Sequence, residues 1–238
     1  MKLKTLSALC LAASTLAMTS TAMAWESEDG QHSTSASVAL SSEYVWRGIS
    51  QSDEDPAISG SLDYAHTSGF YAGTWASNVD FGSESDTSLE IDVYAGFSRE
   101  FGETGLSYDI GVMRYLFPGE GELDFNEVYG SLSYSIFTAG IAHSSDAQGS
   151  GEDGTYYSLG AGYDLPFELA LAAGLGYYDL DKDEFGESGY QDYYIGVSKD
   201  LAGFTFDVTY TDTNSDAEDI FGEELSDDRF IFSVSSSF

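Results

Sequence analysis

The chain is poor in cysteine, proline and basic residues, and it has no long apolar run beyond its first residues. Cys10 is the only cysteine, which excludes disulfide bonds within the chain and cysteine-based metal centres. Only 8 Lys and Arg side chains stand against 41 Asp and Glu. Phosphate backbones are bound by clustered Lys and Arg, so nucleic acid is not an expected partner. No segment after residue 24 approaches the roughly 20 apolar residues of a membrane-spanning helix.

The N-terminus has the features of an export signal, which we expect to cover residues 1–24. Lys2 and Lys4 precede the apolar run Leu6–Met18 and the small-x-small sequence Ala22–Ala24. Cleavage after this sequence leaves 6 of the 8 basic side chains against 41 acidic ones, a net charge of −35. It also removes Cys10, so the exported chain is expected to be stabilised by its fold and not by cross-links.

The remaining composition is that of a folded β-protein and not of a disordered acidic chain. The sequence contains 17 Tyr, 15 Phe and 26 Gly but only 3 Pro. Disordered acidic chains are poor in aromatic residues, whereas this chain can bury a large aromatic surface. The many glycines indicate frequent turns.

Apolar and polar residues alternate along most of the chain, which is typical of strands with two different faces. In the clearest run, Leu89, Ile91 and Val93 share one face, and Glu90 and Asp92 share the other. Twelve such runs occur. Most have about ten residues, the length that a tilted strand needs to cross a bilayer.

The apolar faces of three further runs can be assigned in the same way. The first is expected at 37–47, with an apolar face of Val38, Leu40, Tyr44 and Trp46. The third has an apolar face of Tyr71, Trp75, Val79 and Phe81. The last is Arg229–Phe238, which alternates phenylalanine and valine with serine. We expect these apolar faces to contact lipid and the polar faces to line a lumen.

The connections between the runs alternate between long and short. Five are short, at 66–69, 100–104, around 136, 164–166 and 199–203. Six are long, at 48–55, 82–87, 118–124, 144–154, 181–189 and 213–227. Outer-membrane barrels have an even number of strands, short periplasmic turns and longer outer loops. The sequence therefore predicts an all-β, transmembrane antiparallel β-barrel of 12 strands at 37–238, with both termini in the periplasm and a short periplasmic segment at 25–36.

Several segments resemble one known family. They are Glu43–Gln51, Pro56–Gly60, Gly69–Val79, Glu90–Phe97 and Asn126–Gly130. Together they look like the TorF family of porin-like proteins, which is also known as the Gcw_chp family. The resemblance implies an outer-membrane β-barrel with a pore role and no defined solute. It also implies that the terminal Phe238 is the insertion signal recognised by the barrel-assembly machinery.

The candidate pore-lining residues lie mainly on the polar faces of the runs. They are Glu43, Arg47, Asp63, Glu90, Asp92, Asp109, Glu127, Tyr129, Asp192 and Asp207. Rings of charged side chains set the selectivity of channels, and six basic residues cannot neutralise this many carboxylates. We therefore expect a cell outer-membrane channel that passes small hydrophilic solutes and prefers cations. The alternative is a network of hydrogen bonds that fills a narrow barrel.

Two other functions remain open at this stage. The first is a closed structural or surface-interaction barrel, whose acidic loops would contact lipopolysaccharide through divalent cations. The second is a lipid hydrolase that uses His143 and Ser145, which are two residues apart on a lipid-facing strand. The spacing shows neither an orienting third group nor an oxyanion hole, so no enzyme activity is expected. The sequence indicates no cofactor and no metal centre, and it leaves the oligomeric state open.

Overall fold

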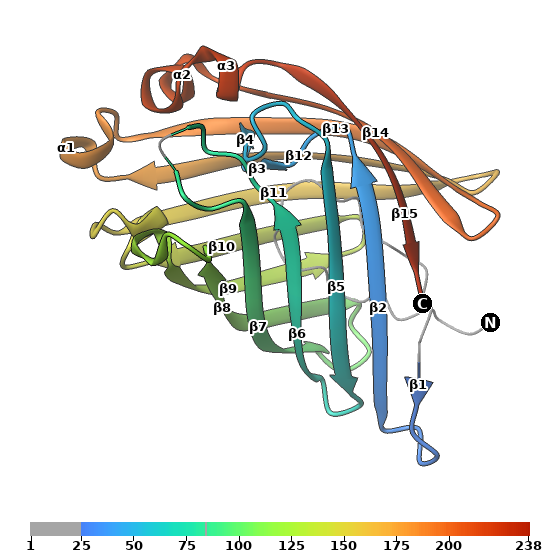
Figure 1. Cartoon of the computed structure of the whole chain (residues 1–238). Helices are drawn as coiled ribbons and strands as arrows, with labels where there is room; N and C mark the ends of the chain where they lie inside the picture. Colours follow the sequence, from blue (N-terminus) through green and yellow to red (C-terminus); the bar gives the residue numbers. More distant parts are fainter. Residues whose placement is uncertain (1–24, 84) are drawn as a thin grey trace.

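Twelve antiparallel strands form a closed barrel in the computed structural model, which describes residues 25–83 and 85–238 (Figure 1). The expected export signal at 1–24 lies outside the described residues. The barrel strands are β2 (His32–Ser41), β5 (Ala57–His66), β6 (Phe70–Asn78), β7 (Leu89–Glu100), β8 (Leu106–Leu116), β9 (Phe125–Tyr134), β10 (Phe137–Ser144), β11 (Gly154–Leu165), β12 (Leu169–Leu180), β13 (Gly189–Leu201), β14 (Phe204–Thr213) and β15 (Arg229–Ser237).

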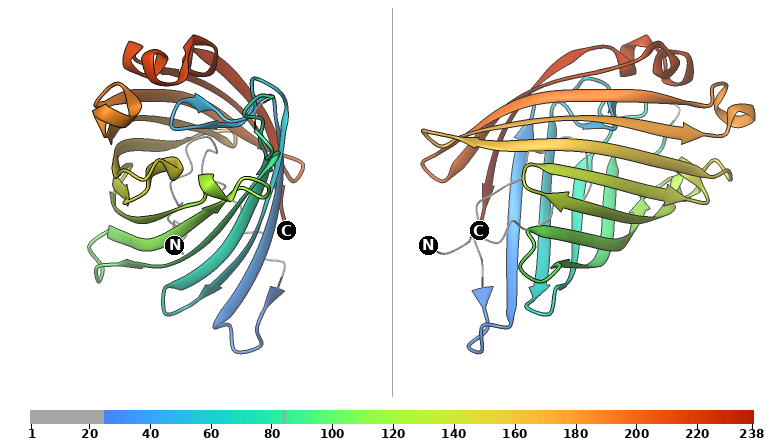
Figure 2. Two further views of the ribbon diagram at one scale, coloured as in Figure 1. Left: turned by 60° about the vertical axis from the view of Figure 1, so that its left-hand side comes forward. Right: turned by 180° about the vertical axis from the view of Figure 1, so that it is seen from behind.

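The sheet closes because the last strand pairs with the first. Ser233 of β15 lies opposite Ser41 of β2, and Ser237 lies opposite Ser37. Phe238 extends this pairing of β15 with β2. Its N–H donates to the Ala36 carbonyl at 2.9 Å, and its carbonyl accepts from the Ala36 N–H at 3.1 Å. Closure gives each of the twelve barrel strands of the described residues a neighbour on both sides (Figure 2). No helix within the described part of the chain is long and apolar enough to cross a membrane.

The connections alternate in length as the sequence predicts. The short turns are 67–69, 101–105, 135–136, 166–168 and 202–203. The second and fourth lie one and two residues later than predicted, and the fifth begins three residues later. The long connections carry η1 (Gly121–Leu123), η2 (Ala147–Gly149), α1 (Lys182–Phe185), α2 (Ser215–Phe221) and α3 (Glu223–Ser226). We call the two ends of the barrel the long-loop end and the short-turn end. Because β2 starts and β15 stops there, β1 (Trp25–Glu26) and Phe238 lie at the short-turn end.

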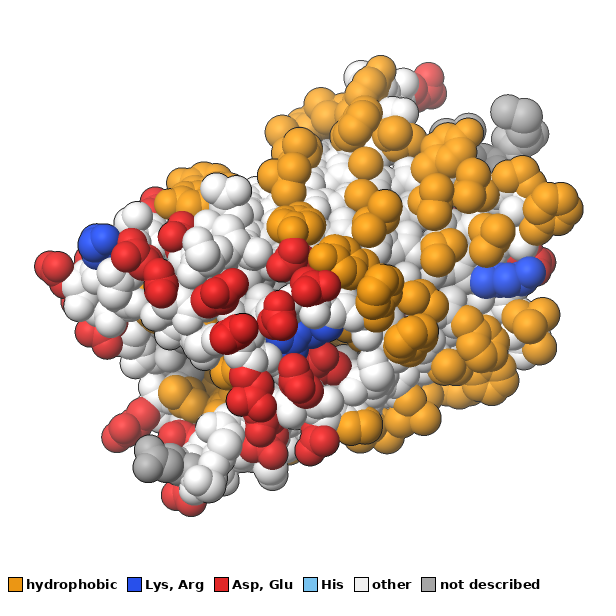
Figure 3. Space-filling view, turned by 90° about the horizontal axis from the view of Figure 1, so that it is seen from above, with side chains coloured by type: hydrophobic (Ala, Val, Ile, Leu, Met, Phe, Trp, Pro, Cys, Tyr) orange, Lys and Arg blue, Asp and Glu red, His pale blue; other side chains and the backbone are white. Residues whose placement is uncertain are grey.

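The outer face of the barrel is apolar over its wall and acidic at the long-loop end. Val112, Leu175 and Phe232 are more than half exposed, and they follow the predicted apolar faces of their strands. Figure 3 shows hydrophobic side chains over the strands and acidic side chains over the loops. Exposed apolar side chains in such number need an apolar surrounding, which is the pattern of lipid-facing strands.

The predicted first strand is wrong at both of its ends. β2 begins at His32, five residues earlier than predicted, and pairs with β1 near the short-turn end. It also stops at Ser41, and the following residues 42–56 turn into the barrel. Tyr44 and Trp46 are therefore buried inside and do not face lipid.

The facing predicted for the third run is also wrong. Tyr71 of β6 donates a hydrogen bond to Asp109, and Trp75 packs 5.1 Å from the ring of the buried Tyr44. Val79, just after the strand, is only 3% exposed. The outer face of β6 is built from smaller residues between Phe70 and Asn78, because the bulky residues here fill the interior.

Candidate functional site

Residues 42–56, which we call the inward loop, fill the long-loop end of the barrel. The loop forms a small hairpin of β3 (Val45–Trp46) and β4 (Ile49–Ser50), with Trp46 opposite Ile49. Its turn is left-handed, with φ of 50° at Arg47 and 82° at Gly48. A Cβ on Gly48 would lie 2.5 Å from Thr213 Cγ2 and 2.9 Å from Asp192 Cβ. Only glycine fits this turn without strain, because it tolerates positive φ and has no Cβ.

Arg47 anchors the inward loop in the centre of the barrel. Its Nη2 atom lies 2.7 Å from Oε1 of Glu127, and the two side chains are only 2% and 4% exposed. Its guanidinium also lies 4.1 Å from the ring centroid of Trp46, 4.3 Å from Tyr156 and 4.5 Å from Tyr178. Burial alone favours the neutral form, but the Glu127 carboxylate outweighs it and raises the pKa of Arg47. The arginine is a permanent buried cation.

Tyrosine hydroxyls hold the carboxylates that surround this cation. Tyr115 donates to Oε2 of Glu127 at 2.9 Å, and Tyr44 donates to Glu90 at 3.0 Å. The hydroxyl of Tyr156 lies 3.0 Å and 3.1 Å from the two carboxylate oxygens of Asp192, to which it donates. Hydrogen bonds to the ionised form stabilise a buried carboxylate, so these contacts offset part of the cost of burying it.

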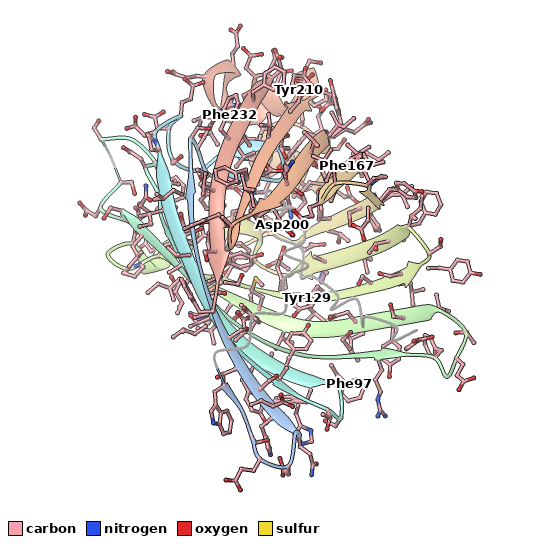
Figure 4. All side chains as sticks on the ribbon, turned by 90° about the vertical axis from the view of Figure 1, so that its right-hand side faces the viewer. Phe97, Tyr129, Phe167, Asp200, Tyr210 and Phe232 are labelled. Atoms are coloured by element: carbon pink, nitrogen blue, oxygen red, sulfur yellow. The ribbon has the colours of Figure 1, made fainter. Side chains whose placement is uncertain are left out.

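A second tyrosine cluster lies deeper in the barrel. Tyr71 donates to Asp109 at 2.6 Å and lies 2.7 Å from the hydroxyl of Tyr129. Tyr94 of β7 donates to Asp63 of β5, which lies two strands away. Figure 4 shows Tyr129 inside the ring of strands. Each of these contacts passes over at least one intervening strand, so the side chains lie across the inner surface of the wall.

Glycines on neighbouring strands make room for these tyrosines. Gly73 lies opposite Tyr94, and Gly111 lies opposite Tyr129, in the strand register. A Cβ on Gly73 would lie 2.7 Å from the Tyr94 ring, and one on Gly111 would meet the ring of Tyr129. We did not predict these pairs, although a tyrosine and a glycine on matching polar positions of adjacent strands is a signal present in the sequence.

All ten candidate pore-lining residues lie on the inner side of the barrel. Nine of them are buried in the ring of strands, and Asp63 is half-buried with Tyr94 and Ser61 as partners. Glu43 and Arg47 come from the inward loop, whereas the other eight come from the wall. Glu43 pairs with Arg229 at the start of β15.

The connection between β14 and β15 covers the inward loop from outside. The ring of Phe221 in α2 lies 5.5 Å from the buried Tyr190 ring, edge to face. Thr213 donates from Oγ1 to the Ser226 carbonyl at 2.7 Å, which fixes the far end of α3. The long-loop end therefore has two layers, the inward loop and the helices α2 and α3 above it.

The arrangement around His143 does not build a hydrolytic centre. His143 lies on the outer face, and its Nδ1 is 2.9 Å from Oγ1 of Thr155 on the neighbouring strand. Between His143 and Ser145 the structure records no hydrogen bond in the described residues. Asp146 accepts from the Gly151 N–H and does not orient the imidazole. Among residues 25–83 and 85–238, no group of three or more His, Cys, Asp or Glu is placed to hold a metal ion.

The comparison with known proteins agrees with this fold. A family model described as a bacterial protein of unknown function, Gcw_chp, matches residues 26–238. No curated protein matches the chain. The solved structure of the KdgM porin is similar with a TM-score of 0.57 at 9% identity, over 86% of this chain and 99% of that one.

Two further solved structures are similar to the same extent. The NanC porin has a TM-score of 0.55 at 11% identity, over 86% of this chain and 98% of that one. An outer-membrane channel from Pseudomonas putida F1 has a TM-score of 0.50 at 12% identity, over 90% of this chain and 97% of that one. At these identities the likeness is one of fold, and it is the fold of outer-membrane porins.

Proposed function

The chain belongs to the Gcw_chp family of bacterial proteins of unknown function, and we propose that it is an outer-membrane, porin-like channel for the passive passage of small hydrophilic solutes, with a preference for cations. The observation that carries the proposal is the distribution of side chains on the closed barrel. Apolar residues cover the outside of the wall, and carboxylates and tyrosines cover the inside. A barrel with these faces is built to lie in lipid and to enclose a polar interior.

The topology of the proposed membrane protein follows from the two ends of the barrel. Short turns belong on the periplasmic side and long loops outside, which puts both termini in the periplasm. The residues 1–24 then act as the export signal. We also propose that the chain is a porin-like protein of the TorF type and that its long-loop end contacts lipid and lipopolysaccharide.

Cation preference follows from the charges of the inner face. Asp92, Asp109 and Asp207 are buried there in the ring of strands, and the one buried basic side chain of the described residues is Arg47. Arg47 is already paired with Glu127. Carboxylates that become hydrated as the lumen opens carry negative charge, and a low-dielectric wall increases their effect on a permeating ion.

The solute of a similar porin does not transfer to this chain. KdgM has been solved in complex with disordered oligogalacturonate, which carries one carboxylate on each sugar. A polyanion of this kind would meet like charge throughout the interior described here. The preferred solutes of this channel are therefore cationic or neutral.

The test is the conductance of the refolded full barrel in planar lipid bilayers. A KCl gradient should give a reversal potential of the sign expected for K⁺ preference. The double variant Asp109→Asn with Asp207→Asn should reduce that potential, because it removes two inner charges. The control Glu103→Gln lies in the exposed turn between β7 and β8 and should leave it unchanged. Anion preference of the parent protein would refute the acidic-lumen reasoning.

The closed-barrel alternative has one observation in its favour, the inward loop. This loop and its cover occupy the long-loop end. A parent protein without conductance is therefore expected both of a gated channel and of a structural barrel. A protein that stays silent at all voltages after Arg47→Ala has released the loop would be a structural barrel. A protein that conducts after release would be a gated channel.

A further inference from the structure

The long-loop end holds a pocket that the pore function alone does not explain. Its volume is about 510 Å³, and its walls come from the inward loop, the neighbouring strand ends and the helices α2 and α3. Pockets of this size suit a small organic molecule. We call it the mouth pocket.

Aromatic side chains form most of one wall of the mouth pocket. Trp46 lies 6.0 Å from Tyr115 and 6.3 Å from Phe125, ring centroid to ring centroid. Tyr115 and Phe125 are stacked at 4.2 Å, and Phe81 lies 5.7 Å from Phe117 on the other side. Such a surface binds aromatic rings, aliphatic chains and cations through their contact with the ring faces. A channel for small hydrophilic solutes alone has no need of it.

The charged groups of the mouth pocket are all acidic. Glu90 and Glu120 are among its lining residues, and no Lys, Arg or His is. Glu120 accepts hydrogen bonds from the Ser85 hydroxyl and, at 3.3 Å, from the Asp86 N–H, which holds its carboxylate at the rim. A bound solute therefore meets the Glu120 carboxylate at the rim of an apolar wall.

A second groove leads to the mouth pocket and is strongly acidic. It shares Phe81, Phe221 and Leu225 with the pocket, so the two are continuous. Its other lining side chains include six carboxylates, those of Asp53, Glu54, Asp80, Glu223, Glu224 and Asp227. Arg229 lies beside the groove, and its Nη1 is 3.9 Å from Glu54 and also pairs with Glu43. Clefts lined by one sign of charge raise the local concentration of ligands of the opposite sign.

We propose that the mouth pocket binds organic cations that carry an aromatic or aliphatic body, and that these amphiphilic cations are the preferred solutes of the barrel. The acidic groove attracts the charge, and the aromatic wall removes the apolar body from water. The pocket lies over the inward loop, so a bound solute contacts the segment that closes the lumen. The binding stands on the pocket alone, whereas the role as solute rests on the proposed channel function.

The experiment uses three probes that separate charge from apolar body. Phenethylamine has both a cationic amine and a ring, ethylamine has the amine only, and 3-phenylpropionate has the ring with a negative charge. Each is added to the long-loop side of the full barrel in a phosphatidylcholine bilayer while the KCl current is recorded. We expect phenethylamine to block half of the current at a concentration about tenfold or more below that of ethylamine, because it buries its ring. The anion 3-phenylpropionate should block least.

A pair of phenylalanine variants tests the place of binding. Phe81→Ala removes a ring of the pocket wall, and Phe101→Ala removes a similarly exposed ring from a short turn at the other end. The half-blocking concentration of phenethylamine should rise about tenfold in Phe81→Ala and stay unchanged in Phe101→Ala. Equal block by phenethylamine and ethylamine, equal block by phenethylamine and 3-phenylpropionate, or an unchanged Phe81→Ala would each overturn the proposal.

Binding is also measured without any current. Trp46 belongs to the pocket wall, so phenethylamine should change the tryptophan emission of the parent protein in vesicles, and the change should weaken in Phe81→Ala. If the barrel conducts KCl but shows neither block nor emission change, the mouth pocket is refuted and the channel stands. If it conducts nothing in any variant but the emission changes as expected, the channel is refuted and the binding site stands.

Discussion

Replacing Arg47 with alanine should release the inward loop and raise the single-channel conductance. The guanidinium makes the 2.7 Å ion pair with Glu127 and contacts three aromatic rings at 4.1 to 4.5 Å. Alanine removes all of these contacts and leaves the Glu127 carboxylate buried without a counter-charge. Among the described residues the loop's other ion pairs, those of Glu43 and Glu54 with Arg229, lie where β15 begins and not at the hairpin of β3 and β4.

The size of the effect follows from the burial of the pair. Removing one partner of a buried ion pair costs about 3–5 kcal/mol, because the other charge stays in a low-dielectric site. In the released loop both groups are hydrated, so this cost falls on the closed conformation only. The ratio of open to closed loop should then rise by about two to nearly four powers of ten.

The assay combines single-channel conductance with tryptophan emission in the same vesicles. Trp46 is 6% exposed in the closed loop, and its emission should shift to the red when the loop meets water. The matched control is Arg114→Ala on the outer face. Arg114 also pairs with a carboxylate, Asp124 at 3.1 Å, but its side chain is 47% exposed. Removing such an exposed pair costs about 0–1 kcal/mol and should change neither signal.

A double variant isolates the ion pair from the loss of packing. Arg47→Met with Glu127→Leu removes both charges and keeps apolar volume, and such replacements are often neutral or stabilising. The inward loop of this double variant should open less often than that of Arg47→Ala, so its conductance should be lower. The reasoning is refuted if Arg47→Ala migrates as a folded, heat-modifiable barrel with the conductance and emission of the parent protein.

Three further predictions concern other parts of the barrel. Gly48→Ala should open the loop as Arg47→Ala does and raise the conductance. Its Cβ would meet Thr213 and Asp192 at positive φ, which costs the closed loop about 1–3 kcal/mol. The control Gly121→Ala, whose Cβ meets nothing within 4 Å, should leave the conductance unchanged. Leu159→Arg, at the middle of β11, should prevent heat-modifiable folding in vesicles, because a midplane charge costs about 2–4 kcal/mol, whereas Phe167→Arg in the 166–168 turn should fold. Deleting Phe238 should slow assembly, because it removes the two backbone hydrogen bonds to Ala36; Phe238→Tyr should assemble at the parent rate, and equal surface levels of the deletion would contradict its role as insertion signal.

The strands and their connections were predictable because lipid and lumen impose opposite polarity on successive residues. Leu159 and Tyr163 of β11, for example, lie on the apolar side of an alternating run and are exposed. The long and short connections followed from the same pattern, since each break in alternation marks a strand end. This information is local, so the sequence contains it directly.

The inward loop was not predictable from the same pattern. Tyr44 and Trp46 continue the alternation of Val38 and Leu40, so a period of two extends the strand through them. What turns the chain inward is a left-handed turn at Arg47 and Gly48 and an ion pair with a residue 80 positions away. Neither signal has a period, and the partner Glu127 can be found only once the barrel has closed.

The facing of β6 failed for a different physical reason. The alternation rule assumes that the lumen side is polar, but Tyr71 and Trp75 are large aromatic residues that fill the interior. A tyrosine faces inward equally well, because its ring packs on glycine and its hydroxyl bonds a carboxylate. Aromatic residues therefore mark neither face by themselves, and only their partners on neighbouring strands decide.

The inner carboxylates also bear on the choice between a channel and a filled barrel. Asp92, Asp109 and Asp207 each keep one buried oxygen without a hydrogen-bond partner among the described residues. Leaving such a group unpaired costs about 1–3 kcal/mol, and more for a charge. A barrel selected only for stability would pair these oxygens, as Tyr115 and Arg47 pair both oxygens of Glu127. These oxygens are buried in the closed conformation, so water or a cation reaches them only when the lumen opens, and their presence on β7, β8 and β14 lowers the cost of opening it.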